Sequence, residues 1–206
     1  MNITLEEIVF KTFNDLVSVT KSKIGKETVA SILGKRVPLT TKLFEDNISD
    51  LLYFLVCQRV TTSFSTRLGK VIENLCKELI KYRGGKIIDK PNPFDLKFIL
   101  NDNEEYWIEI KSIDGQNSSN KQSIADRKKL AEDNGKIFKL CIYNDDKQFD
   151  QDYKLNGQQF WDFILGEENS QDKIFSLIKG KGIDLSVKNI IEENFNRLDI
   201  EYKSQH

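Results

Sequence analysis

The segment PFDLKFILNDNEEYWIEIK, residues 93–111, contains the most informative pattern in this sequence. Its first part alternates with a two-residue period that predicts a strand, with Phe94, Leu96, Phe98 and Leu100 expected on one face and Asp95, Lys97 and Ile99 on the other. A turn at 101–103 separates it from a second apolar strand over 106–112. We therefore expect the segment to form an antiparallel hairpin.

This hairpin should bring charged side chains together at one end of a sheet. Glu109 and Lys111 are two residues apart, so they share one face of the strand, while Ile108 and Ile110 face the core. Because the turn folds the second strand back beside the first, Asp95 is expected opposite the end of that second strand. Two carboxylates and one ammonium group should thus converge.

Helical periodicity surrounds the hairpin. Before it we expect helices over residues 1–20, 26–33, 47–60 and 66–82, followed by a short strand at 86–88. Thr4 is the expected N-cap of the first helix, and a polar break at 61–65 separates the last two helices. After it we expect a polar loop at 112–123, and then a helix, a strand and three helices over residues 124–132, 137–143, 157–165, 171–178 and 185–198. This order indicates an α/β or α+β fold with a central mixed β-sheet flanked by helices. We interpret the chain as one domain, with a helical N-terminal part at 1–60, a core at 61–145 and a helical C-terminal part at 146–206.

The composition narrows the possible chemistry. The 206-residue chain has a formal charge of −1, and its only histidine is His206, which excludes a Ser-His-Asp triad, a Cys-His dyad and a histidine-based zinc site. The three separated cysteines, Cys57, Cys76 and Cys141, are typical of a reducing cytosol. No run is apolar enough for a membrane span or a signal peptide. We expect a cytoplasmic protein whose chemistry uses Asp, Glu, Lys or Tyr.

The expected group of Asp95, Glu109 and Lys111 has the composition of a hydrolytic metal site. Mg²⁺ prefers carboxylate oxygens and water, and Mn²⁺ substitutes for it, so Asp95, Glu109 and the backbone carbonyl of Ile110 are the candidate ligands. The metal would polarise a phosphate and lower the pKa of a bound water. Lys111 would orient or deprotonate that water and offset the developing negative charge.

The pattern Pro93-Phe94-Asp95 followed by Glu109-Ile110-Lys111 resembles the motif of the PD-(D/E)XK nuclease superfamily. The second half matches in full, whereas Phe94 stands between the proline and the aspartate of the first half. The resemblance implies a restriction-endonuclease-like core, and a glutamate on the preceding helix that completes the metal site. Glu73 is the candidate for this glutamate, and Glu78 is the competing choice.

A second segment, LNGQQFWDFI at 155–164 followed by Gly166, is similar to one found after the core of some type II restriction enzymes, the Eco47II-like and TdeIII-like groups. We interpret its aromatic residues, Phe160, Trp161 and Phe163, as core or dimer packing. Together the resemblances imply Mg²⁺-dependent, sequence-specific cleavage of double-stranded DNA by a homodimer. The apolar run Leu51–Val56 and the C-terminal helices are the candidate dimer surfaces.

Candidate DNA contacts follow the catalytic strand and flank the helix of Glu73. Polar side chains that suit base edges and phosphates form the run Gln116, Asn117, Ser118, Ser119, Asn120, Lys121 and Gln122. Backbone contacts are expected from Arg59, Arg67 and Lys70, while the run Arg127–Lys129 is more typical of a solvated helix face. Two other functions stay open: a repair or recombination nuclease such as a junction resolvase, and a non-catalytic DNA-binding module in which Glu109 and Lys111 form a surface pair.

Overall fold

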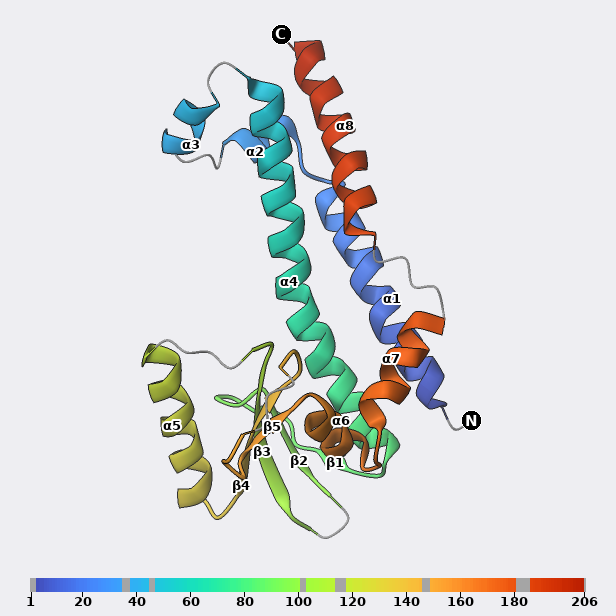
Figure 1. The fold of residues 1–206 in the computed structure, drawn as a ribbon, viewed down its shortest axis with the longest axis vertical. Helices are drawn as coiled ribbons and strands as arrows, with labels where there is room; N and C mark the ends of the chain where they lie inside the picture. Colours follow the sequence, from blue (N-terminus) through green and yellow to red (C-terminus); the bar gives the residue numbers. More distant parts are fainter. Residues whose placement is uncertain are drawn as a thin grey trace. The chain divides into compact units, whose positions relative to one another are not determined.

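The computed structural model shows a mixed α/β protein with a five-stranded sheet flanked by helices (Figure 1). It describes residues 3–34, 38–44, 47–100, 103–113, 118–145, 149–180 and 186–205. The chain packs into two compact units, which we call the sheet unit, Met1–Phe13 with Gly69–Gly182, and the helical unit, Asn14–Leu68 with Ile183–His206. Among the described helices, none combines the length and the apolar character needed to cross a membrane.

The strands of the sheet unit lie side by side in their order along the chain. The first three, β1 (Lys86–Ile87), β2 (Leu96–Ile99) and β3 (Glu105–Lys111), pair antiparallel. The last two, β4 (Ile137–Ile142) and β5 (Lys154–Asn156), extend the sheet in parallel from β3. The predicted hairpin is therefore confirmed as β2–β3, and α5 (Ser118–Asp133) is the helical crossover that a parallel β3–β4 pair requires.

Different helices cover the two faces of the sheet (Figure 1). On one face Phe98 stacks on Tyr106, and both rings contact Phe163 of α6 (Gly157–Leu165). The C-terminal part of α4 (Ile48–Tyr82) covers the same side (Figure 1), with Leu75, Cys76 and Leu79 fully buried. On the other face, α5 packs through Ala131 against a cluster that includes Phe94, Phe138, Leu140 and Ile142.

The strict alternation expected for residues 94–100 is wrong at its beginning. Leu96 and Phe98 are fully buried, as expected, and Phe98 contacts Phe163 of α6. Phe94, however, packs in the cluster under α5, 4.9 Å from the ring of Trp107. Because β2 begins only at Leu96, the chain changes direction at Asp95 and turns Phe94 to the opposite face.

The expected helix break at 61–65 is also wrong, because α4 is continuous for 35 residues. The hydroxyl of Thr61 donates to the carbonyl of Cys57 at 2.8 Å, and Ser63 is buried. A Thr or Ser hydroxyl can donate to a backbone carbonyl of the preceding turn, and this bond satisfies the side chain without interrupting the helix. Thr and Ser often occur at helix ends, but here the buried residues of α4 before and after this segment keep the helix continuous.

Most other elements agree with the expectation, with shifted ends. Thr4 caps α1 (Leu5–Ile24) through a reciprocal pair of bonds with Glu7, 2.8 and 3.2 Å long. Helix α5 begins six residues earlier than expected, and two short elements were not expected at all, α3 (Pro38–Leu43) and β5. The remaining helices match predicted ones, namely α2 (Val29–Leu33), α6, α7 (Ser170–Gly180) and α8 (Val187–Gln205).

The helical unit has its own apolar core. Leu52, Val56 and Val60 of α4 pack with Ile190 and Leu198 of α8. Leu51, Leu52 and Val56 are therefore buried inside their own chain, so only part of the run Leu51–Val56 remains for the predicted dimer surface. Within that run, only Tyr53 and Phe54 are exposed.

Ile108 lies at the centre of the sheet and is fully buried, so Ile108→Ala should lower the free energy of unfolding by about 2–5 kcal/mol. Ile113, just past the end of β3, is 61% exposed, and Ile113→Ala should change it by no more than about 0.5 kcal/mol. Urea unfolding followed by circular dichroism measures both. Equal losses for the two variants would contradict this placement of the core.

Candidate active site

The end of β3 brings Asp95 and Glu109 together. Leu96 pairs with Ile108, so Asp95, the residue before β2, lies opposite Glu109. The N–H of Asp95 donates to the carbonyl of Ile108 at 3.1 Å, and the N–H of Ile110 donates to Oδ2 of Asp95 at 2.7 Å. The carboxylate of Asp95 thus takes the hydrogen-bonding position that β2 leaves open at the edge of β3.

The carbonyl of Ile110 points to the same edge. The N–H of Tyr143 donates to the carbonyl of Lys111 at 3.1 Å, so the backbone of Lys111 faces β4. Successive residues of a strand direct their N–H and C=O groups to alternate sides, and both groups of one residue point the same way. Because the N–H of Ile110 bonds to Asp95, its carbonyl also faces the side of Asp95, as required of a third oxygen donor.

Glu109 is a buried carboxylate, with 1% of its side chain exposed. The Nζ of Lys111 lies 2.5 Å from Oε1, and the guanidinium of Arg127 on α5 contacts Oε2. The expectation that Glu109 and Lys111 both lie on an exposed strand face is therefore wrong for Glu109, because α5 covers it. A charge removed from water needs close partners, and each oxygen of Glu109 has a cation.

Arg127 is the site residue that the sequence interpretation missed. It lies three residues after Ile124 and four before Ala131, and both of these pack into the cluster under α5. This i, i+3, i+7 spacing is the pattern of a helix face that contacts a sheet, and it would have identified Arg127 as inward-facing. The apolar residues around it were too few to make the stripe obvious.

A groove of about 540 Å³ opens beside Arg127, and it is lined by Pro93, Gln122, Ser123, Asp126, Arg127 and Leu130. It reaches from Pro93, two residues before Asp95, to the cation that contacts Glu109. The groove gives a ligand access to the Arg127 end of the charged group. We call it the Arg127 groove.

Among the described residues, Glu73 does not form one metal-binding cluster with Asp95 and Glu109. Its Oε2 lies 2.6 Å from Nζ of Lys70, and the described residues contain no cluster of three or more Asp, Glu, His or Cys side chains that could hold a metal ion. Burial raises the pKa of the Cys76 thiol, with further contributions from Cys141 and Glu73, and burial also raises the pKa of Cys141, with a smaller contribution from Asp95.

Five of the seven candidate base-reading residues lie at the start of α5 instead of in a loop. Gln116 and Asn117 lie outside the described residues. Ser118, Ser119 and Asn120 form the first turn of the helix. Two exposed residues follow, Lys121 and Gln122, and the amide of Gln122 donates to Asp126 at 2.8 Å.

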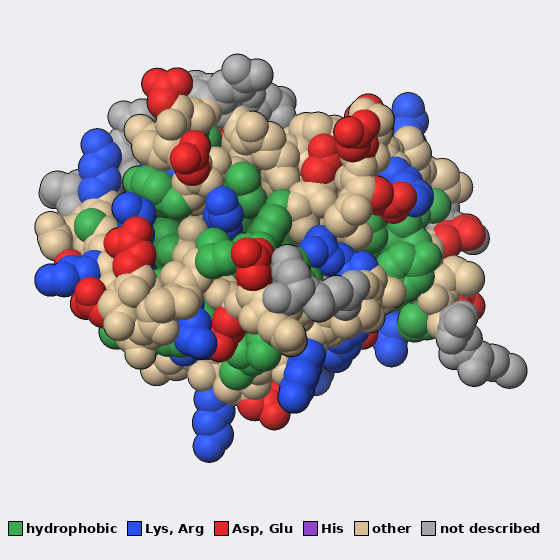
Figure 2. All heavy atoms as spheres, turned by 90° about the horizontal axis from the view of Figure 1, so that it is seen from below, with side chains coloured by type: hydrophobic (Ala, Val, Ile, Leu, Met, Phe, Trp, Pro, Cys, Tyr) green, Lys and Arg blue, Asp and Glu red, His purple; other side chains and the backbone are tan. Residues whose placement is uncertain are grey.

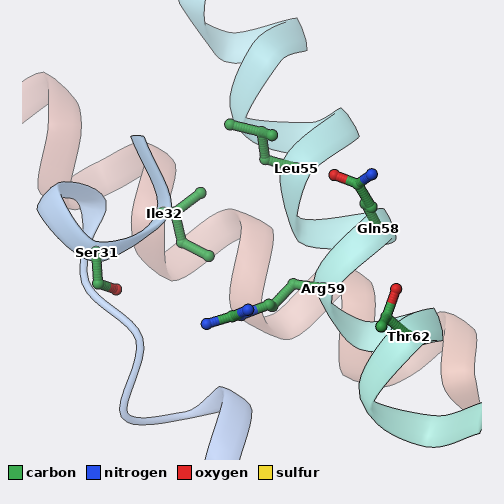
Figure 3. Close-up of a pocket in the computed structure, with 6 residues that line it drawn as sticks. All are labelled: Ser31, Ile32, Leu55, Gln58, Arg59 and Thr62. Atoms are coloured by element: carbon green, nitrogen blue, oxygen red, sulfur yellow. The ribbon is translucent and has the colours of Figure 1, made fainter. Parts of the chain in front are cut away.

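The candidate backbone contacts Arg59 and Arg67 belong to the helical unit. The Nε of Arg59 lies 2.9 Å from Oε1 of Glu27, whose other oxygen accepts a bond of 2.6 Å from the hydroxyl of Ser31. Figure 3 shows Arg59 extending from α4 towards Ser31, in a pocket of about 270 Å³. Arg67 contacts the hydroxyl of Ser63 at 3.5 Å. Both guanidinium groups thus have partners within their own unit.

The donors at the end of β3 fit a hard divalent cation. Two carboxylates and one backbone carbonyl supply oxygen ligands, which Mg²⁺ and Mn²⁺ prefer. Both oxygens of Glu109 already bind positive groups, so a metal ion would replace one of these contacts. No family model and no curated protein matches this sequence, so the functional conclusion depends on this geometry.

Arg127→Ala should lower the free energy of unfolding by about 1–3 kcal/mol, because buried Glu109 would keep Lys111 but lose one of its two charged partners. In a Glu109→Gln background the same substitution should cost less, because a neutral amide does not need a cation. Urea unfolding of the four proteins gives the coupling energy.

The exposed pair Lys188–Glu192, 3.6 Å apart on α8, is a control. Lys188→Ala should change stability by about 0.5 kcal/mol or less. Additive effects of Arg127→Ala and Glu109→Gln would show that their contact does not stabilise the fold.

Proposed function

We propose that this protein is a cytoplasmic, Mg²⁺-dependent DNA endonuclease of the PD-(D/E)XK superfamily, acting as a type II restriction enzyme on double-stranded DNA. The observation that carries the proposal is the placement of Asp95 opposite Glu109, with Lys111 in contact with Glu109. The order β2, β3, α5, β4, preceded by α4, is also the order that the motif implies for the core.

Each residue at the end of β3 has a separate role in the proposed reaction. Asp95, Glu109 and the carbonyl of Ile110 would hold the metal, which supplies polarisation of the scissile phosphate and a lowered pKa for the attacking water. Glu73 would complete the site through a bridging water. The Nζ of Lys111, on a side chain that is 40% exposed, would orient the water as an ammonium group, or accept its proton in the neutral amine form.

We infer that two copies act together, because cleavage of both strands at a palindrome requires two sites related by a two-fold axis. Apolar side chains remain exposed on helices of the helical unit, with Phe54 43%, Tyr53 45% and Ile200 69% accessible. These side chains are the candidate contacts between copies. Each copy would supply one complete metal site from its own sheet unit.

Two other functions make different use of the same residues. A junction resolvase would have an identical metal site, and digestion of a sequence-diverse plasmid separates the two, because discrete fragments indicate restriction and cleavage of branched DNA alone indicates a resolvase. The second alternative is a non-catalytic DNA-binding protein. Buried Glu109 is in contact with two cations, and an ion pair that only stabilises the fold would have the same arrangement. The DNA binding of such a protein would not respond to Mg²⁺.

Lys111→Ala and Glu109→Gln should each reduce the rate of cleavage by at least about 10²–10⁴-fold, because one removes the proposed acid–base group and the other a metal ligand. Glu109→Gln is preferred to Glu109→Ala, because the amide keeps the volume of this buried side chain and one oxygen that can still accept hydrogen bonds from Lys111 or Arg127. Glu78→Gln, in an exposed pair with Lys81, is the matched control.

Single-turnover cleavage of labelled duplex DNA measures these rates. Glu78→Gln should cut like the unsubstituted protein, which also tests the choice of Glu73 over Glu78. Cutting by either Lys111→Ala or Glu109→Gln at close to that rate would show that the proposed site is wrong.

Cleavage should require Mg²⁺ or Mn²⁺, whereas Ca²⁺ should support DNA binding without cutting. Asp95 and Glu109 place negative charge where a phosphate must bind, and any divalent cation reduces that repulsion. Ca²⁺ forms longer bonds in a looser geometry, so it should activate water poorly. Asp95→Asn should lose cleavage and bind DNA with less need for metal.

Gel-shift and digestion assays run in parallel under EDTA, Ca²⁺ and Mg²⁺ test this prediction. Gel shifts should strengthen with either cation, and products should form only with Mg²⁺ or Mn²⁺. Complete digestion in EDTA would contradict the metal site and the roles of all three residues together.

A further inference from the structure

Helix α5 borders a second groove, of about 460 Å³, which we call the basic groove. Four lysines line it, Lys121, Lys128 and Lys129 from α5 and Lys154 from β5, and its one acidic residue is Glu132. None of these residues lines the Arg127 groove, so the two grooves use different sides of the same helix.

Much of the positive charge in the basic groove is not neutralised. Lys121 and Lys129 are exposed, and neither forms an ion pair within the described part of the chain. Lys128 lies 3.2 Å from Glu132, but this is an exposed pair of the kind that contributes little. On the face shown in Figure 2, basic and acidic side chains are interspersed. The lining of the basic groove contains four lysines and one glutamate, although the formal charge of the whole chain is −1.

Aromatic side chains hold two of the lysines in place. The Nζ of Lys128 lies 4.9 Å from the ring centre of Tyr153, and the Nζ of Lys154 lies 4.7 Å from that of Phe149. A cation over an aromatic face is attracted to the ring, which restricts where the ammonium group lies. The rings thus position ammonium groups along the groove.

We propose that the basic groove binds the sugar–phosphate backbone of DNA outside the cleaved phosphate, an inference that rests on the proposed function. Lys121 and Lys128 are seven residues apart, about 10 Å along a helix axis. Phosphates of one strand are spaced about 3.4 Å along a duplex axis, so this row spans about three of them. Lysines contact phosphates as point charges without reading bases, so the groove adds affinity that is independent of sequence.

This placement gives α5 two roles in one complex. One side of the helix presents Arg127 to Glu109, and another side presents lysines to the backbone. An acidic polypeptide would also be attracted to lysines. The lysines extend over the length of several backbone phosphates, on the same helix that presents Arg127 to the proposed site, and we therefore assign the groove to DNA.

The test compares Lys121→Ala/Lys129→Ala with the control Lys11→Ala/Lys179→Ala. The control pair also removes two exposed helical lysines without an ion pair in the described part, from α1 and α7. Alanine is favoured at exposed helical positions, so all four substitutions should leave the fold intact, which circular dichroism checks. Anisotropy of a labelled 30-base-pair duplex, in EDTA and in Ca²⁺, gives the affinity across a range of salt concentrations.

The slope of log K against log salt should become shallower by about 2 in Lys121→Ala/Lys129→Ala, because each lost phosphate contact contributes about 0.9. The control should keep the original slope. An unchanged slope, or an equal change in both variants, would overturn the proposal, as would a loss of binding to poly-glutamate without a loss of binding to DNA.

The same data distinguish failure of the groove from failure of the proposed function. If the unsubstituted protein cuts DNA while the variant keeps its slope, the groove is not the backbone site and the nuclease stands. If the slope changes but no preparation cuts DNA with Mg²⁺, the groove binds DNA and the nuclease proposal is wrong.

Discussion

The burial of the Glu109 carboxylate is the constraint on which the sheet unit depends. A carboxylate that is 1% exposed must have positive partners, and it receives one from its own strand and one from α5. The contact from Arg127 therefore fixes which side of α5 faces the sheet, together with Ala131 and Ile124. One ion pair and two apolar contacts thus orient the crossover helix that connects β3 to β4.

The same contacts explain why the site is compatible with two kinds of function. In a structural interpretation, Lys111 and Arg127 neutralise Glu109 permanently. In the catalytic interpretation, Lys111 and Arg127 neutralise Glu109 only until substrate binds. A divalent cation would then balance the charge of Glu109, and the two basic side chains would lie close to the phosphate. Asp95 favours the second interpretation, because it brings another carboxylate to the same strand edge, held there by the N–H of Ile110.

The hairpin and the placement of Asp95 opposite Glu109 could be predicted, because strand periodicity and a short turn act over few residues. The burial of Glu109 could not, because it depends on packing by α5, which lies outside the strand. The continuity of α4 was missed because Thr61 and Ser63 resemble helix-end residues until their partners are known. Strand β5, with three residues, is too short for its period to be recognised. The sites of Gln116 and Asn117 stay predictions, since both lie outside the described residues.

The two buried thiols of the sheet unit could be used to measure how often this unit opens locally. Cys76 and Cys141 are fully buried with raised pKa values, so neither ionises to the nucleophilic thiolate while its surroundings stay closed. Cys57, in the helical unit, is partly accessible. An alkylating reagent would therefore modify the three cysteines at very different rates, and the slow rates would report how often the sheet separates from the helix that covers it.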